Sequence, residues 1–217
     1  MTRKIYFIRH GQSEWNELGK INSLTETSLS DEGIIQCNKL SRIIKALNIG
    51  KIFTSPLRRA QQTAQIINKN VNKLIQIDER LRELDFGKFE GFTMDFNGNE
   101  TLKNEFQRWH EGIGSTIPDT VESFEKCQMR GNEFIEELIN NETENVIVVT
   151  HGVFLRIIIM ACILKSNAAL YKKLKVDNGS ICVVEIESNG AVRLASLNLS
   201  YSIIKQTENK VISRYMS

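Results

Sequence analysis

One segment of this 217-residue chain restricts the fold more than any other. Glu144-Asn-Val-Ile-Val-Val-Thr150 is apolar through its centre and polar at its ends. Apolar side chains on both faces are typical of a parallel strand that helices cover from two sides. The segment runs into His151-Gly152 and then into an apolar helix that we expect to reach Leu164. A strand, a short turn and a helix in this order predict an α/β fold.

The rest of the chain repeats this alternation. The expected strands are Lys4–Ile8, Lys51–Thr54 and Leu74–Ile77, followed by a hairpin of Ser180–Ile186 and Val192–Leu199 that turns near Asn189-Gly190. One expected helix has Ser30 as its N-cap and Gly33 at its third position, and the next has Ser55 as its N-cap and Pro56 at its first position. Two more helices are expected, one from near Leu102 to His110 and one from Asp119 to Ile139. The alternation predicts a mostly parallel sheet flanked by helices.

Composition excludes several classes of protein. The 28 Lys and Arg residues against 26 Asp and Glu residues give a net charge of +2, too balanced for a nucleic-acid partner. No apolar run approaches the roughly 18 residues of a membrane span, and the N-terminus lacks the apolar core of a signal peptide. The four cysteines form no CxxC pair, which favours free thiols in a reducing compartment. We therefore expect a cytoplasmic protein without a membrane or nucleic-acid partner.

Two of the three histidines share one local context. His10 follows Ile8-Arg9 and precedes Gly11, and His151 follows Thr150 and precedes Gly152, so each lies where an apolar strand ends. Ligands of open α/β sheets bind at the carboxyl ends of the strands, and both imidazoles are expected at that edge. A glycine after each histidine allows a ligand or another backbone to come close.

Cations and carboxylates are expected at the same edge. Arg9 adjoins His10, and Arg58 and Arg59 lie in the first turn of the helix after Lys51–Thr54. Guanidinium groups and helix N-termini both favour a phosphate or a carboxylate. The carboxylates that follow the third strand are Glu79, Glu83, Asp85 and Glu90, and sequence position alone does not choose among them.

Five ordered blocks between positions 4 and 156 resemble the histidine phosphatase superfamily, whose fold is that of phosphoglycerate mutase. The blocks are Arg9-His10-Gly11 with Glu14-Trp15-Asn16, Leu29-Ser-Asp-Glu-Gly33, Ser55-Pro-Leu-Arg-Arg-Ala-Gln-Gln-Thr-Ala64, Leu81-Arg-Glu-Leu-Asp-Phe-Gly87 with Glu90-Gly91, and Val148-Val-Thr-His-Gly152. The resemblance implies a three-layer sandwich in one domain, residues 1–217. A small cap insertion of about residues 84–120 is expected over the carboxyl edge of the strands, and a polar tail of about residues 201–217.

The resemblance also implies a role for individual residues. His10 is the nucleophile that becomes a phosphohistidine, Glu83 is the proton donor, and Arg9, Arg59 and a protonated His151 line the phosphate pocket. Further contacts to substrate are implied for Gly11, Asn16, Asn22, Ser23 and Gly152. Chemistry adds one expectation, since an imidazole attacks phosphorus in its neutral form: a backbone carbonyl should hold the other nitrogen of His10. No metal and no cofactor are expected.

These residues together predict a metal-independent phosphatase acting on a small phosphorylated metabolite. A phosphoglycerate mutase is the alternative enzyme, but Asp85-Phe86-Gly87 and the short, phenylalanine-rich segment after it differ from the mutase branch. The phenylalanines and Trp109 are expected either to form an apolar wall for the leaving group or to fill a core. A non-catalytic module that binds phosphorylated ligands is a third hypothesis. The chain is expected to be a monomer or a homodimer.

Overall fold

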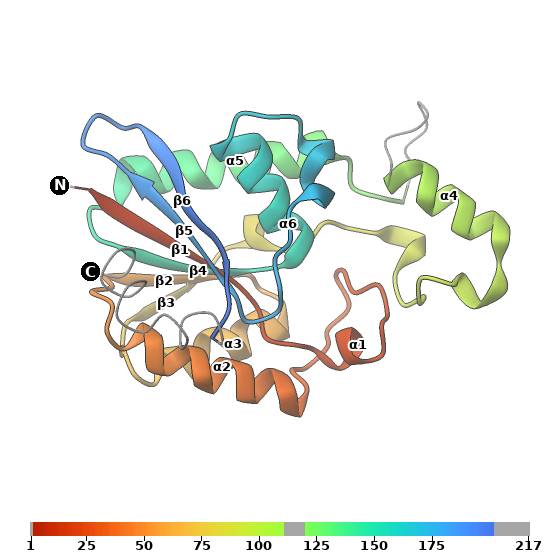
Figure 1. The fold of residues 1–217 in the computed structure, drawn as a ribbon, viewed down its shortest axis with the longest axis horizontal. Coiled ribbons are helices and arrows are strands. Elements are labelled where there is room, and N and C mark those ends of the chain that lie inside the picture. Colours follow the sequence, from red (N-terminus) through yellow and green to blue (C-terminus); the bar gives the residue numbers. More distant parts are fainter. Residues whose placement is uncertain (1, 111–119, 202–217) are drawn as a thin grey trace.

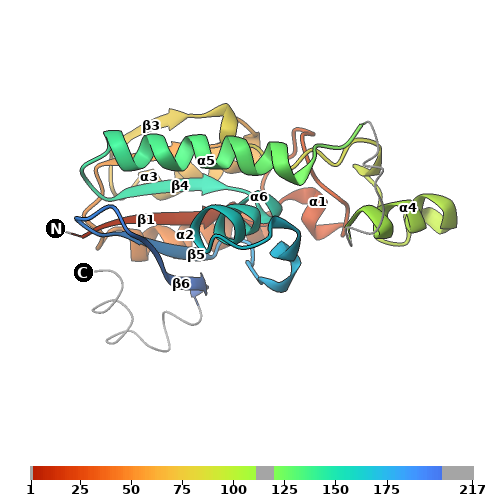
Figure 2. The ribbon, with the colours of Figure 1, turned by 90° about the horizontal axis from the view of Figure 1, so that it is seen from above.

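The computed structural model describes residues 2–110 and 120–201. A central sheet lies between two layers of helices (Figures 1 and 2). The strands are β1 (Arg3–Arg9), β2 (Lys51–Thr54), β3 (Leu74–Ile77), β4 (Val146–Thr150), β5 (Ile181–Ile186) and β6 (Val192–Leu199). The helices are α1 (Glu14–Glu17), α2 (Asp31–Ile44), α3 (Arg58–Asn68), α4 (Glu100–His110), α5 (Phe124–Asn141) and α6 (Gly152–Ile157). None of the helices in this described part is long and apolar enough to cross a bilayer.

The sheet has the order β3-β2-β4-β1-β5-β6. Strands β3, β2, β4 and β1 are parallel to one another, whereas β5 is antiparallel to both of its neighbours, β1 and β6. The prediction of a mostly parallel sheet that ends in a hairpin is therefore confirmed. β4 is buried along its whole length, as its apolar sequence predicts.

Each face of the sheet buries its own layer of helices. Tyr6 and Ile8 of β1 pack in a cluster with α2 and α3, while Ile5 and Phe7 point to the opposite face and pack with α5 and α6. Successive side chains of a strand point to opposite faces, which explains the alternation. Burying one such side chain contributes about 1.5–3 kcal/mol, so both faces hold the central strands in place.

Pairing of β1 with β4 sets the position of the two histidines. Ile8 lies opposite Val149 and Arg9 opposite Thr150 in the parallel register. The His10 N–H then donates to the Thr150 carbonyl at 2.9 Å. His10 and His151 therefore leave the sheet side by side at its carboxyl edge, as the sequence predicts.

The predicted start of the helix after β2 is wrong. Ser55 and Pro56 do not begin α3, which starts at Arg58 with Leu57 as an N-cap that makes no side-chain bond. The Ser55 hydroxyl accepts from the Leu57 N–H at 3.3 Å and bonds to His151 Nε2 at 2.7 Å. The Ser55 hydroxyl thus bonds to His151 and does not cap α3.

Two further helices differ in detail from the prediction. The helix after β4 is α-helical only to Ile157 and continues as a wider π-helix over Ile158–Ile163. The helix expected from Asp119 begins at Phe124 with Ser123 as its cap; Asp119 itself lies outside the described residues. The cap of α2 is as predicted, because the Ser30 hydroxyl accepts from the Gly33 N–H at 3.2 Å.

The segment that carries α4 extends beyond the carboxyl edge of the sheet (Figure 1). Its interior is an aromatic cluster of Phe89, Phe96, Phe106 and Trp109, in which the centroids of neighbouring rings lie 5.2–6.1 Å apart. Residues 111–119 of the expected cap and 202–217 of the expected tail lie outside the described residues.

Gly33 of α2 packs directly against the backbone of Gln12, in the loop after His10, and a substitution at Gly33 tests this contact. A Cβ at this position would lie 2.0 Å from the Gln12 carbonyl oxygen, which is backbone and cannot move aside alone. Gly33→Ala should lower the free energy of unfolding by about 1–3 kcal/mol, the usual cost of overpacking. Urea unfolding measures the loss, with the exposed neighbour Glu32→Ala as control, expected to change stability by less than about 1 kcal/mol. Equal stability of the two variants would contradict this packing.

Candidate active site

His10 is buried and held as a neutral nucleophile. Its Nδ1 lies 2.7 Å from the Gly11 carbonyl, which can only accept, so Nδ1 carries the proton. Its Nε2 accepts from Arg59 Nε at 3.3 Å and therefore presents a lone pair. The expectation that a backbone carbonyl holds the second nitrogen is confirmed.

His151 lies beside His10, with ring centroids 5.1 Å apart and planes inclined by 60°. One nitrogen, Nε2, bonds to the Ser55 hydroxyl, and Nδ1 is buried without a partner in the described part of the chain. The two rings come from β1 and β4, 141 positions apart in the sequence. The sequence-predicted meeting of the two imidazoles is what the structure shows.

Two buried guanidinium groups flank the imidazoles. Besides its bond to His10, Arg59 donates to the carbonyls of Ser23 at 2.6 Å and Thr25 at 3.1 Å. Arg9 donates to the Val176 carbonyl at 2.8 Å, while its Nε is buried and has no partner among the described residues. Burial lowers the pKa of both arginines to about 10, so both remain cationic at neutral pH.

Burial also holds both imidazoles neutral. Desolvation, followed by the positive charges of Arg59 and Arg9, keeps the pKa of His10 well below its usual value. For His151 the causes are desolvation and then the charges of Arg59, His10, Arg130 and Arg9, and its pKa is also well below the usual value. Without a bound anion, His151 is therefore neutral, whereas the prediction of a protonated His151 concerns the complex with phosphate. A bound phosphate dianion would favour its protonation.

Glu83 is the carboxylate that reaches this site. It lines the same cavity as Arg9 and Gly152. Its Oε1 accepts from the N–H groups of Leu84 and Phe154 at 2.9 and 2.7 Å, and its Oε2 from Val153 at 3.1 Å. Of the other candidates, Glu90 accepts from Ser23 and Thr25, and Asp85 accepts from Gly87. The structure therefore makes the choice that sequence position left open.

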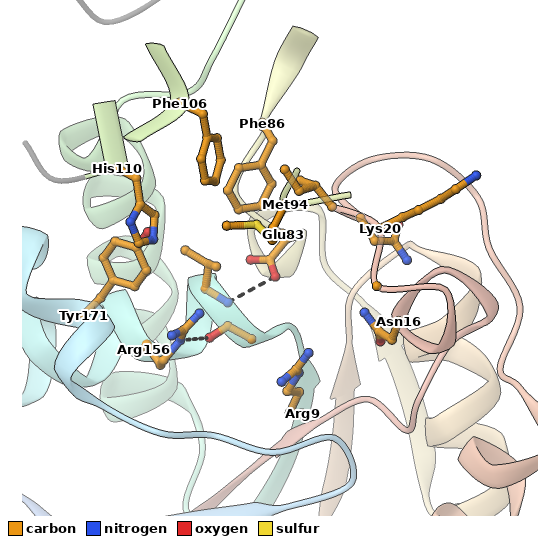
Figure 3. Close-up of a pocket in the computed structure, with 15 residues that line it drawn as sticks. Arg9, Asn16, Lys20, Glu83, Phe86, Met94, Phe106, His110, Arg156 and Tyr171 are labelled. Atoms are coloured by element: carbon orange, nitrogen blue, oxygen red, sulfur yellow. Dashed lines mark hydrogen bonds between the residues drawn. The ribbon is translucent and has the colours of Figure 1, made fainter. Parts of the chain in front are cut away.

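The cavity has a volume of about 310 Å³, and Phe106 and His110 of α4 lie on one side of it (Figure 3). Arg9, Asn16, Glu83 and Gly152 line its inner end. The rest of its wall combines aromatic and aliphatic side chains with cations: Lys20, Ile21, Phe86, Met94, Phe106, His110, Val153, Arg156 and Tyr171. Phe86 and Phe106 thus belong both to the cavity wall and to the hydrophobic core, whereas Phe89, Phe96 and Trp109 belong to the core and do not line the cavity.

The residues expected to make further substrate contacts divide into two groups. Asn16, Asn22 and Gly152 line the cavity, and the buried Oδ1 of Asn22 has no partner among the described residues. A Cβ on Gly152 would lie 2.9 Å from Arg9 Nε, so this glycine makes room for the guanidinium.

Gly11 and Ser23 do not line the cavity. A Cβ on Gly11 would lie 2.7 Å from both Cys37 Sγ and the Gly33 carbonyl, so Gly11 allows another backbone, not a ligand, to come close. The Ser23 hydroxyl donates to Leu84 and accepts from Phe86, and its carbonyl binds Arg59. Ser23 therefore ties Arg59 to the segment around Glu83, residues 81–87, which is called the acid segment below.

Several residues of the site carry no clear signal in the sequence. Asn178 donates through Nδ2 to the His10 carbonyl at 3.2 Å and to Asn16 Oδ1 at 3.0 Å. Ser55 bonds to His151, and Arg156 and Tyr171 line the cavity. Arg58, the neighbour of Arg59, does not line this cavity. Asn178 and Ser55 act through the histidines, so only the folded chain reveals them.

The site is one for an oxyanion. Two cationic guanidinium groups, two imidazoles and a carboxyl group meet at one edge of the sheet, and the unpartnered Arg9 Nε and His151 Nδ1 are buried there. Among residues 2–110 and 120–201, no group of three or more His, Cys, Asp and Glu side chains is placed to hold a metal ion. Arrangement and fold together define a phosphoryl-binding α/β protein with a histidine nucleophile.

Comparison with known proteins gives the family. The model of the histidine phosphatase superfamily (branch 1) matches residues 5–200, so the chain belongs to that superfamily. The α/β fold agrees with it: a phosphoserine phosphatase mutant from Entamoeba histolytica, solved in complex with phosphoserine, superposes with a TM-score of 0.78 at 29% identity, over 90% of this chain and 96% of that one.

Two curated relatives carry different names. Phosphoserine phosphatase 1 of Hydrogenobacter thermophilus is 28% identical over 91% of this chain and 92% of its own length. A protein of Cronobacter sakazakii named probable phosphoglycerate mutase GpmB is 29% identical over 86% of each chain. The two names correspond to the two enzyme activities that the sequence predicts, a phosphatase and, as the alternative, a phosphoglycerate mutase.

The buried imidazoles predict a dependence of stability on pH. The pKa of each is well below the usual value in the folded protein, so below about pH 6.5 the unfolded chain binds more protons than the folded one. As the pH drops below that value, each of the two histidines should lower the free energy of unfolding by up to about 1.4 kcal/mol for every pH unit. Urea unfolding without added phosphate, from about pH 7 to 5, measures this slope.

A variant separates these two groups from the carboxylates, which titrate at lower pH. His151→Gln should remove about half of the slope. An equal free energy of unfolding at both ends of this pH range in the unmutated protein would show that the histidines are not held neutral.

Proposed function

We propose that this chain is a metal-independent phosphoric monoester hydrolase that acts on a small phosphorylated metabolite through a phosphohistidine on His10. The observation that supports it most is the state of His10: Nδ1 donates to the Gly11 carbonyl, Nε2 accepts from Arg59 Nε, and the ring centroid lies 5.1 Å from that of His151. Membership of the superfamily and the phosphatase names among the relatives support the proposal.

The first chemical step transfers the phosphoryl group to the enzyme. The substrate phosphate takes the place of the Arg59 contact at His10 Nε2, and this nitrogen attacks phosphorus while the bond to the leaving oxygen breaks. Glu83, in its carboxylic acid form, gives the proton to that oxygen. Arg9, Arg59 and His151 stabilise the negative charge on the three equatorial oxygens.

The second step releases phosphate. The Glu83 carboxylate takes a proton from a water molecule, which attacks the phosphohistidine as the bond between phosphorus and Nε2 breaks. This returns His10 to the neutral form and Glu83 to the acid form, so the cycle closes with inorganic phosphate and an alcohol as products. The backbone N–H groups of Val153 and Phe154 hold the Glu83 carboxyl group in one place for both steps.

The size and lining of the cavity support a small substrate. About 310 Å³ leaves room for a phosphate group and a short alcohol. In this proposal the alcohol lies next to four residues that line the cavity, Phe86, Met94, Phe106 and Arg156 (Figure 3). In this proposal, residues 1–217 form one domain and the segment of about 84–120 acts as a cap that contacts the leaving group. A cytoplasmic location also belongs to the proposal, supported by free thiols at Cys37, Cys127, Cys162 and Cys182.

A phosphoglycerate mutase is the second candidate, favoured by the name of the relative from Cronobacter sakazakii. It uses the same phosphohistidine but returns the phosphoryl group to a substrate in place of water. Incubation with 2- and 3-phosphoglycerate, with and without a bisphosphate primer, separates the two activities. Isomer interconversion faster than phosphate release would replace the phosphatase by the mutase.

His10→Ala should abolish turnover, because the variant loses the attacking nitrogen. The fold should remain intact, because backbone groups make the ladder of β1 with β4 and the bond from the His10 N–H to the Thr150 carbonyl. Brief reaction with a ³²P-labelled ester, followed by quenching in alkali, where phosphohistidine survives, should label the unmutated protein and not this variant. Label that persists in His10→Ala would place the nucleophile elsewhere. Circular dichroism of the variant is the control for folding.

Glu83→Gln should reveal the proton donor through the leaving group. With an alkyl phosphate, kcat/KM should fall by about 10²–10⁴-fold, because an alkoxide needs a proton as it leaves. With an aryl phosphate such as p-nitrophenyl phosphate the fall should be much smaller, since the phenolate leaves without help. Equal losses for both esters would contradict the role of Glu83.

A further inference from the structure

Arg130 of α5 is buried next to the acid segment but does not line the cavity. Its guanidinium group donates from Nη1 to the carbonyls of Arg80 at 2.6 Å and Arg82 at 2.7 Å. From Nη2 it donates to the carbonyl of Glu83 at 3.2 Å. One side chain thus binds three backbone carbonyls within the four residues that end at the proton donor.

Glu122 completes this network. Both of its oxygens bind Arg130, at 2.8 Å from Nε and 3.0 Å from Nη2, and the two side chains are only 11% and 10% exposed. Its Oε2 also accepts from the Asp85 N–H at 3.2 Å, and its own N–H donates to the Asp85 carbonyl at 2.9 Å. The ion pair therefore holds the segment on both sides of Glu83.

A second contact of Arg130 reaches the carboxyl group from the other direction. The guanidinium carbon lies 4.1 Å from the centre of the Phe154 ring. The Phe154 N–H makes the shortest of the three bonds to the Glu83 carboxyl group, at 2.7 Å. Arg130 thus touches both the backbone that carries Glu83 and the residue that orients its oxygens.

We propose that Arg130, paired with Glu122, is a positioning residue for the proton donor. This inference rests on the proposed function, because it assumes that Glu83 protonates the leaving group. The acid segment needs such support because Glu83 and its neighbours Arg82 and Leu84 belong to no helix or strand. Five donors in a rigid plane suit three carbonyls and a carboxylate, a pattern that a lysine cannot reproduce.

The test compares two leaving groups in Arg130→Lys. A shift of Glu83 by about 1 Å should cost about 10²-fold in kcat/KM for an alkyl phosphate. For an aryl phosphate the loss should stay within about 3-fold, because that leaving group needs no proton. The hydrogen bonds of Arg130 go to the carbonyls of residues 80, 82 and 83, to Glu122 and to Cys127, and not to the groups proposed to bind phosphate. The inhibition constant of inorganic phosphate should not change, because Arg9, His10, Arg59 and His151 keep their contacts.

A double mutant shows whether Arg130 acts through Glu83. In the Glu83→Gln background, Arg130→Lys should have no further effect on the alkyl ester, since the group that it positions is gone. Arg80→Met is the matched control: Arg80 joins the same segment to α5 through Glu137, but its side chain does not contact Glu83. This variant should leave the ratio of the two kcat/KM values unchanged.

Glu122→Gln is the milder variant if Arg130→Lys does not fold. It keeps an oxygen for the Asp85 N–H but removes the charge opposite Arg130, and the ratio should shift in the same direction by a smaller factor. Equal losses for both esters, or additive losses in the double mutant, would overturn the positioning role and leave the phosphatase intact. A wild-type protein that hydrolyses neither ester would overturn the proposed function itself.

Discussion

The bond from Arg59 to His10 is the interaction around which the site is built. A guanidinium group that is fully buried needs acceptors for its donors, and here these are one imidazole nitrogen and the carbonyls of Ser23 and Thr25. The loop that follows α1 is therefore folded onto a charge. Burial, and after it the same charge, lowers the pKa of both imidazoles, so that His10 stays neutral at neutral pH. Arg59 thus holds the loop of Ser23 and Thr25 in place and favours the neutral form of His10.

The position of the Arg9 guanidinium group depends on a glycine, Gly152. Arg9 can occupy its place only because Gly152 has no Cβ, which would lie 2.9 Å from Arg9 Nε. Gly152 also begins α6, whose first turn supplies the N–H groups that bind Glu83. The glycine after His151 therefore links Arg9, the proposed phosphate-binding arginine, to Glu83, the proposed proton donor. A bulkier residue there would disturb both ends of the reaction at once.

Local patterns were enough to predict the sheet and its two histidines. The strands β2 and β3 have the predicted bounds, and His10 and His151 lie at one edge because apolar runs end directly before them. The failures concern contacts made across the fold. Ser55 has the sequence of a helix cap but bonds to His151, 96 positions away, and Ser23 binds Leu84, 61 positions away. The low pKa of His151 in the free protein likewise depends on contacts across the fold, first on burial and then on the charges of Arg59, His10, Arg130 and Arg9.

The nucleophile and the proton donor are held by different means. His10 follows directly from β1, where the ladder to β4 and a bond to the Thr150 carbonyl fix its backbone. Glu83 lies in an irregular segment, which has no ladder and depends on side chains from α5 and on the first turn of α6. A parallel sheet imposes its geometry on any sequence that forms it, whereas a network such as that of Arg130 and Glu122 depends on particular residues. The position of the acid is therefore the part of this site that substitutions distant from the substrate can change most readily.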